Sequence, residues 1–198
     1  MANRVQLLHH PGSTHLSLSD GPDGFDRSWF MGKWDVVWST LPMWKDKKEF
    51  EDLVEYRARS STDGSKTYTS KCQNKEPSGR ANDIAVRGID TLSPASNGAT
   101  FDWKGKGLLF FVHSHWEVLG YGKDVEQELE WAVTYFSKTL FTPAGIDIYI
   151  RTTPFSSKPQ NFTAREALLQ RLINEAQNND VDSIRNLAKQ GFRVPGNV

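Results

Sequence analysis

Apolar and polar residues alternate through most of the chain from about residue 30 to residue 152, which is the period of a β-strand with one buried face. Gly, Pro, Asn and Asp residues separate the alternating runs. Short strands at this spacing predict an antiparallel sandwich or barrel. We expect eight or nine strands, within residues 34–40, 50–60, 66–73, 84–92, 100–104, 108–112, 116–121, 128–137 and 145–152. In the first run, Trp34, Val36 and Trp38 are expected to share one face.

The chain changes to a helical period near its C-terminus. Thr163 and Glu166 have the spacing of a capping box. In this motif the Thr side chain accepts from the backbone N–H of the Glu, and the Glu side chain accepts from the backbone N–H of the Thr. A second, shorter helix is expected from residue 180 to residue 190, with Gly191 as its C′ residue. One face of the first helix is apolar and should pack on the outside of the barrel: Leu168, Leu169, Leu172, Ile173 and Ala176. An independent helix hairpin is the alternative, although so short a pair buries little by itself.

Length and composition indicate one domain with an arm. Residues 1–28 are rich in Ser, Gly, Asp, His and Pro, which predicts a loosely held N-terminal arm. Residues 29–198 are expected to form a mainly β domain with C-terminal helices at about 162–190. The N-terminus lacks the apolar core of a signal peptide, and no run reaches the ~20 apolar residues of a membrane span. We therefore expect a cytoplasmic protein.

Charge and cysteine content exclude several classes of function. Lysine plus arginine and aspartate plus glutamate number 24 each, so no net field attracts nucleic acid or an anionic membrane, and neither is expected as a partner. Cys72 is the only cysteine, which rules out an internal disulfide and a cysteine-based zinc site. The sequence does not indicate the oligomeric state.

Aromatic residues make up 12% of the chain, a high share that favours a site for a flat apolar ligand. If the strands close into a barrel, strand alternation places a set of aromatic side chains in its lumen as ligand-binding candidates: Trp38, Tyr56, Tyr68, Phe101, Trp103, Trp116 and Trp131. The alternative is that a barrel this small is filled by its own side chains.

Polar residues give few candidates for chemistry. His113 and His115 share a strand face and resemble part of the cupin metal motif, but the Glu and third His of that motif are missing, so no metal and no cofactor are expected. His115 is then a hydrogen-bonding or proton-donating group near the barrel rim. Arg87 interrupts an apolar stretch and is either a solvated side chain or, if inward, a strong donor to a ligand. No nucleophile elbow, Walker loop or dinucleotide fingerprint is present.

Gly32-x-Trp34 before the first strand, Arg151 at the end of the last strand and the terminal helix together resemble the lipocalins and the wider calycin group. The resemblance implies an up-and-down antiparallel β-barrel in which Trp34 plugs one end and Arg151 packs across it. In general character the chain is most similar to small cytosolic lipocalin-like proteins of fungal secondary metabolism, including cofactor-free hetero-Diels–Alderase-type pericyclases.

Two functions follow as hypotheses. In the first, an aromatic cup binds a hydrophobic polyketide- or terpenoid-type substrate and promotes a pericyclic cyclisation, with His115, Tyr135 and Arg87 as candidate catalytic residues. Such a reaction needs mainly positioning and hydrogen bonds to a polarised group. In the second, the same cup is an intracellular carrier of a hydrophobic small molecule and performs no chemistry.

Overall fold

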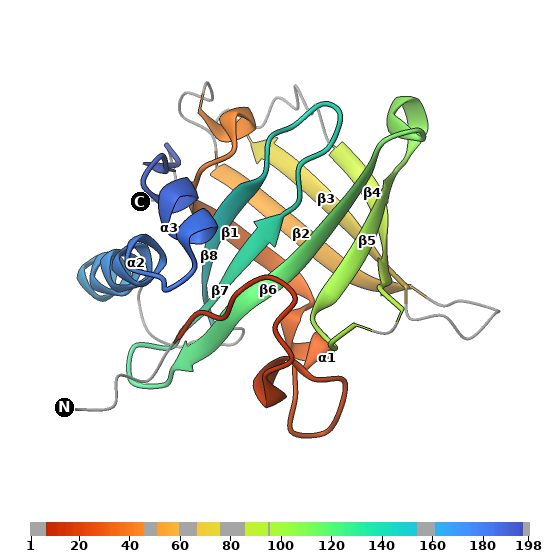
Figure 1. The fold of residues 1–198 in the computed structure, drawn as a ribbon. Coiled ribbons are helices and arrows are strands. Elements are labelled where there is room, and N and C mark those ends of the chain that lie inside the picture. Colours follow the sequence, from red (N-terminus) through yellow and green to blue (C-terminus); the bar gives the residue numbers. More distant parts are fainter. Residues whose placement is uncertain are drawn as a thin grey trace.

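The computed structural model describes residues 7–45, 51–59, 67–75, 86–94, 96–153 and 161–195 of the chain. Eight antiparallel strands form a closed barrel, because β1 pairs with β2 on one side and with β8 on the other (Figure 1). The strands are β1 Gly32–Ser39, β2 Glu51–Arg59, β3 Thr67–Lys75, β4 Val86–Leu92, β5 Thr100–Gly105, β6 His113–Asp124, β7 Leu129–Phe136 and β8 Gly145–Thr152. A two-residue strand, β9 (Phe192–Arg193), pairs with the end of β1. The predicted mainly β barrel with C-terminal helices is confirmed.

Residues 108–112, which were expected as a strand, have another structure. Gly107–Leu109 form the 3-10 helix η3, and a turn leads from it into β6, which is one twelve-residue strand. Gly107 adopts a positive φ of 63°, a conformation that glycine reaches without steric cost. The apolar run lies at the barrel end rather than in the sheet, and Leu108, Phe110 and Phe111 are exposed there.

Trp34 and Arg151 close one end of the barrel. The Trp34 ring is fully buried and its Nε1 donates to the Phe30 carbonyl at 2.8 Å. The Arg151 guanidinium lies 3.8 Å from the centre of that ring and donates to the carbonyls of Trp29 and Met31 at 2.6 and 2.8 Å. Its Nε also donates to Glu130 at 2.7 Å. The predicted packing of the arginine across the tryptophan is therefore confirmed.

Steric constraints explain why the Gly-x-Trp motif has glycine at position 32. Gly32 follows helix α1 (Arg27–Phe30) and has a φ of 103°, which side-chain-bearing residues rarely adopt. A Cβ at this position would also stand 3.3 Å from the Arg151 guanidinium. Glycine therefore lets the chain turn from α1 into β1 while Arg151 fits against the turn.

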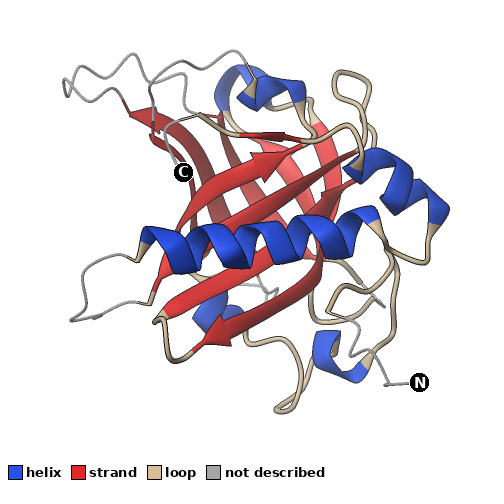
Figure 2. Ribbon diagram, turned by 90° about the vertical axis from the view of Figure 1, so that its left-hand side faces the viewer, coloured by secondary structure: helices blue, strands red, loops and turns tan. Residues whose placement is uncertain are grey.

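Two helices follow β8, and the longer one covers the outer face of the sheet. Helix α2 (Phe162–Gln177) lies across the strands (Figure 2), and helix α3 (Asp182–Ala188) packs beside it. The five residues of the predicted apolar stripe are all buried, in a cluster with Ile146, Ile148 and Ile150 of β8. The predicted site of packing is confirmed. No helix within the described ranges is long and apolar enough to cross a membrane.

Both predicted helix ends differ in detail. The N-cap of α2 is Asn161, whose side chain accepts from the backbone N–H of Ala164, while the Glu166 carboxylate binds Arg193. Helix α3 ends three residues before Gly191. A Cβ on Gly191 would lie 1.8 Å from the Trp38 ring, so this glycine permits close packing rather than a helix cap.

The segment before α1 packs against the barrel, unlike the loosely held arm expected from composition. Leu8, Leu18 and Phe25 are almost fully buried. The backbone N–H of His9 donates to the Leu119 carbonyl of β6, and the Tyr121 hydroxyl donates to the Ser17 carbonyl. Leu8 packs in the cluster on the outside of the barrel, whereas Leu18 and Phe25 pack in the same cluster as Trp34.

Candidate functional site

The end of the barrel opposite Trp34 contains a cavity of about 480 Å³. Its walls come from the inner faces of the strands, and its mouth lies among η2 (Pro42–Trp44), the β5–β6 connection and the β7–β8 loop, along the top of Figure 1. Apolar and aromatic side chains dominate the lining: Leu41, Met43, Trp44, Val54, Tyr56, Val86, Trp103, Leu109, Phe111, Val112, Trp116, Phe136, Phe141 and Tyr149. The polar or sulfur-bearing residues of the lining are Ser70, Cys72, Asp90, Ser114, Thr139, Thr142 and Asp147. The volume is in the range of pockets for drug-sized ligands.

Stacked rings form one wall of the cavity. Trp116 stacks on Phe101 with 4.5 Å between ring centroids, and Phe136 lies on a nearly parallel plane 6.1 Å away. Tyr56 adds a tilted ring 5.4 Å from Trp116. Flat aromatic walls of this kind favour a flat or conjugated apolar guest.

Asp147, on β8 next to β7, is a buried carboxyl group of the cavity lining. Its Oδ1 accepts from the Ser39 hydroxyl, and its Oδ2 accepts from Trp44 Nε1 at 3.2 Å and from the Tyr149 hydroxyl at 3.4 Å. Burial raises the pKa of Asp147 to about 7, although the three hydrogen bonds act in the opposite direction. The group is therefore partly protonated near neutral pH.

Asp90, on β4, is the second buried carboxyl group of the cavity. Its Oδ1 accepts from Trp116 Nε1 at 2.8 Å, and burial raises its pKa to about 6. Hydrogen bonds from Ser70 and Trp116 partly offset that rise. Neither carboxyl was singled out from the sequence. Strand alternation gave no signal for either one, because an inward carboxylate has the same spacing as a solvated one.

The structure divides the seven predicted lumen residues into two groups. Tyr56, Trp103 and Trp116 line the cavity, and Tyr68 and Phe101 pack in the same inner cluster. Trp38 and Trp131 instead lie on the outside of the barrel, in the cluster beneath α2, so the lumen position expected for them is wrong. A β-bulge lies between Val36 and Trp38 and shifts the register of β1 against β8. This bulge turns Trp38 to the outside of the barrel.

The outward position of Trp131 has a different cause. On β7 the lumen face is the more polar one and includes Glu130, Ala132 and Thr134, whereas the outer face is covered by α2 and is apolar. Tyr135 shares that outer face and packs at the edge of the outer cluster. Its predicted position facing the ligand is therefore wrong as well. Burial raises the pKa of its hydroxyl.

His115 also lies outside the lumen. Its Nδ1 is 2.8 Å from Asp102 of β5, and its Nε2 is 3.8 Å from Glu117, on the partly exposed outer surface. His113 is exposed on the same face. Within the described residues, no three His, Cys, Asp or Glu side chains gather in a way that could hold a metal ion.

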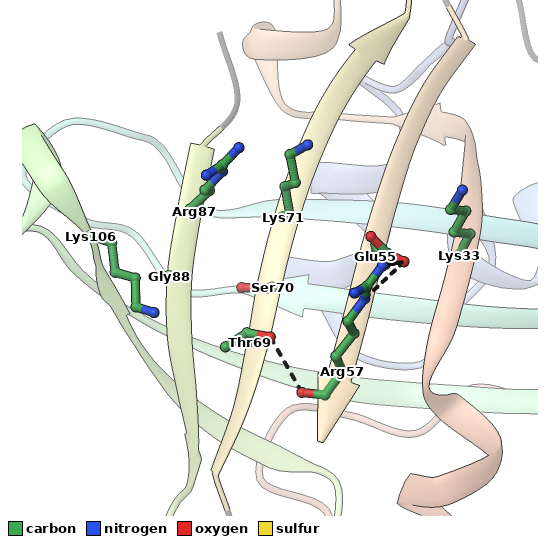
Figure 3. Close-up of a pocket in the computed structure, with 9 residues that line it drawn as sticks. All are labelled: Lys33, Glu55, Arg57, Thr69, Ser70, Lys71, Arg87, Gly88 and Lys106. Atoms are coloured by element: carbon green, nitrogen blue, oxygen red, sulfur yellow. Dashed lines mark hydrogen bonds and ion pairs between the residues drawn. The ribbon is translucent and has the colours of Figure 1, made fainter. Parts of the chain in front are cut away.

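Arg87 is exposed on the outer surface of β4, so it does not reach the cavity (Figure 3). It pairs directly across the strands with Lys71, and its backbone carbonyl accepts from the Lys106 N–H. A shallow basic hollow surrounds it, lined by Lys33, Glu55, Arg57, Thr69, Ser70, Lys71, Gly88 and Lys106. Of the two positions considered for Arg87, the solvated one is observed.

Comparison with solved structures supports the fold. Apocrustacyanin C1 superposes with a TM-score of 0.52 at 13% identity, over 96% of this chain and 89% of that one. Insecticyanin from the tobacco hornworm Manduca sexta superposes with a TM-score of 0.51 at 15% identity, over 94% of this chain and 88% of that one. No protein-family model and no curated protein matches the sequence. Together with the closed eight-stranded barrel, the Trp34–Arg151 plug and the C-terminal helix, these likenesses show that the chain has a lipocalin-like fold.

Proposed function

We propose that the protein binds a hydrophobic small molecule of the polyketide or terpenoid type in the barrel cavity. The observation that carries the proposal is the cavity itself, which is plugged by Trp34 and Arg151 at one end, open at the other, and lined mainly by apolar and aromatic side chains. The inner side chains do not fill the lumen, so the alternative of a solid core does not apply at this end. A guest that stacks on Trp116 would gain about 25 cal/mol of binding free energy for each Å² of apolar surface that it removes from water.

A second function, cofactor-free pericyclic cyclisation of the bound molecule, is favoured by the two buried carboxyl groups. Asp90 and Asp147 both line the cavity and both have raised pKa values. A protonated carboxyl in a dry site can donate a hydrogen bond to a carbonyl or quinone methide and stabilise charge that develops during ring closure. This proposal gives the acid role to Asp147, which has the higher pKa, rather than to His115, Tyr135 or Arg87.

Ligand capture from a metabolite extract tests the binding proposal. Purified protein is incubated with fractionated metabolites of the source, re-isolated by gel filtration, and its retained compounds are identified by mass spectrometry. Ser114→Phe fills the mouth from inside, whereas His113→Phe, one residue earlier, adds the same ring to the outer face. We expect wild type and His113→Phe to retain one apolar compound class and Ser114→Phe to lose it. Equal retention by both variants would place binding elsewhere.

Product analysis separates the two functions. Incubation of the retained compound class with catalytic amounts of protein should yield a cyclised product if the chain is an enzyme. Asp147→Asn should then slow its formation more than it weakens binding. A carrier returns every retained compound unchanged.

A further inference from the structure

Asp90 lines the cavity, and one oxygen of its carboxyl has no hydrogen-bond partner among the described residues. Asp90 is 1% exposed and lines the cavity wall. While Oδ1 accepts from Trp116, Oδ2 has no hydrogen-bond partner among the described residues. A buried acceptor left unsatisfied costs roughly 1–3 kcal/mol. The missing partner is therefore expected to come from the cavity.

The groups around Asp90 all act as donors toward it. Trp103 Nε1 donates to the Ser70 hydroxyl oxygen at 3.0 Å, which leaves the Ser70 proton for the Asp90 carboxyl. Trp116 supplies the other donor. Asp147, in contrast, has partners on both oxygens. With a pKa of about 6, Asp90 is mostly ionised at pH 7 and acts as an acceptor.

We propose that a hydroxyl or amine N–H of the ligand donates to Asp90 Oδ2, which makes Asp90 the polar anchor of the cavity. This inference rests on the proposed binding function and narrows its ligand class. The ligand is an extended apolar ring system with a phenol, alcohol or amine at the end that reaches Asp90, and its rings lie against Trp103 and Trp116. An otherwise identical compound without the donor leaves the buried oxygen unpaired and binds more weakly.

A pair of fluorescent probes tests the anchor: 1-hydroxypyrene, which carries a donor, and 1-methoxypyrene, which does not. Fluorescence anisotropy titrations at pH 7 should show roughly tenfold tighter binding of 1-hydroxypyrene to wild type. Asp90→Asn keeps an acceptor for Trp116 but turns an amide N–H₂ toward the cavity, so the preference should disappear. Asp102→Asn, on the outer face of β5 beside His115, is the control and should keep the preference.

The outcomes separate this inference from the binding proposal. If wild type binds both probes with equal affinity, the Asp90 anchor is refuted while the cavity remains a binding site. If neither probe binds, the binding proposal itself fails. The comparison of the two probes on wild type does not depend on how well either variant folds.

A second, independent observation concerns the loops at the cavity mouth, which expose large apolar side chains. Leu108 and Leu140 are 92% and 90% exposed, and Phe110, Phe111 and Phe141 are more than half exposed. The rings of Phe111 and Phe141 meet at 5.8 Å, so the β5–β6 connection and the β7–β8 loop form one continuous rim. A clustered apolar surface of this kind indicates a contact surface rather than scattered exposed residues.

The charges on these two loops have one sign. Residues 104–115 include Lys104 and Lys106, residues 137–144 include Lys138, and neither segment contains an Asp or Glu. We infer that the rim docks on a bilayer that contains anionic lipid, with the apolar side chains in the interface and the lysines at the headgroups. An apolar ligand could then pass between bilayer and cavity without crossing water. The sequence predicted no membrane partner because the net charge of the whole chain is zero. That sum does not show that the charged residues of these two loops are all lysines.

Vesicle co-sedimentation tests the docking surface. We expect the protein to sediment with phosphatidylcholine vesicles that contain phosphatidylserine, and less with phosphatidylcholine alone. The double variant Leu108→Ser, Leu140→Ser should lose sedimentation, whereas Leu16→Ser, which removes a 67%-exposed leucine of η1 (Leu16–Leu18) at the closed end, should keep it. No sedimentation of wild type, or equal sedimentation of both variants, would overturn the inference. Concentration-dependent dimerisation that only the double variant loses would assign the rim to a second copy instead.

Discussion

Replacing Asp147 by asparagine should change how the stability of the protein depends on pH. The carboxyl is completely enclosed, and burial raises its pKa from the ordinary 3.8 to about 7. The folded chain therefore binds a proton more strongly than the unfolded chain does. This contribution to stability is fully present below the unfolded-state pKa and is lost as the pH rises through the folded-state pKa.

The magnitude follows from the pKa difference of about 3, at about 1.4 kcal/mol for each pKa unit, which gives a loss of about 4 kcal/mol of unfolding free energy between pH 4 and pH 8. Asparagine has nearly the same shape, can still accept from Trp44 and Tyr149, and does not titrate. Relative to wild type, Asp147→Asn should gain up to about 4 kcal/mol on going from pH 4 to pH 8.

Urea unfolding followed by tryptophan fluorescence at several pH values measures this difference. Subtracting the wild-type curve removes the titration of all shared groups, including Asp90. Asp102→Asn, on the exposed outer face beside His115, is the matched control and should show a much smaller pH-dependent difference. The burial argument would be refuted if the unfolding free energy of Asp147→Asn minus that of wild type stays constant with pH or falls as the pH rises.

Two further predictions concern packing. Arg151→Met should lower the unfolding free energy by about 3–5 kcal/mol in urea titrations, because Glu130 stays buried without its arginine and two carbonyls lose their donor; a loss under 1 kcal/mol would show that the plug is not a stabilising unit. Gly191→Ala should lower the melting temperature through overpacking against Trp38, at a cost of about 1–3 kcal/mol. Gly21→Ala is the control, because a Cβ there meets only the Ser19 Oγ at 3.9 Å and Gly21, like Gly191, does not have a positive φ; a larger loss at Gly21 than at Gly191 would contradict the packing argument.

The closed end of the barrel could be predicted from the sequence because its signal is local. Gly32 and Trp34 stand two residues apart and Arg151 ends the last alternating run, and the resemblance of this pattern to the lipocalins implied both the plug and its partner. The apolar stripe of α2 is equally local, since a helix face depends only on the 3.6-residue period.

The lumen could be predicted only in part because strand faces depend on register and on what covers the sheet. A single bulged residue moved Trp38 to the outside, and alternation alone contains no sign of the bulge. On β7 the choice between two alternating faces depended on α2, which lies far away in sequence and makes the outer face the more apolar one. Asp90 and Asp147 were overlooked for the same reason, since an inward carboxylate has the same spacing as a solvated one.

Quenching of individual tryptophans by a bound ligand tests the central claim most directly. Titration of the captured metabolite, or of 1-hydroxypyrene, should quench the intrinsic fluorescence of wild type in a saturable way and raise the melting temperature. Because Trp103 and Trp116 line the cavity while Trp38 and Trp131 lie outside the barrel, Trp116→Phe and Trp103→Phe should each remove part of the quenched signal. Trp38→Phe and Trp131→Phe should leave the quenched signal nearly unchanged. Saturable quenching carried by Trp38 or Trp131 in place of the three cavity tryptophans, Trp44, Trp103 and Trp116, or no saturable quenching at all, would contradict a ligand site inside the barrel.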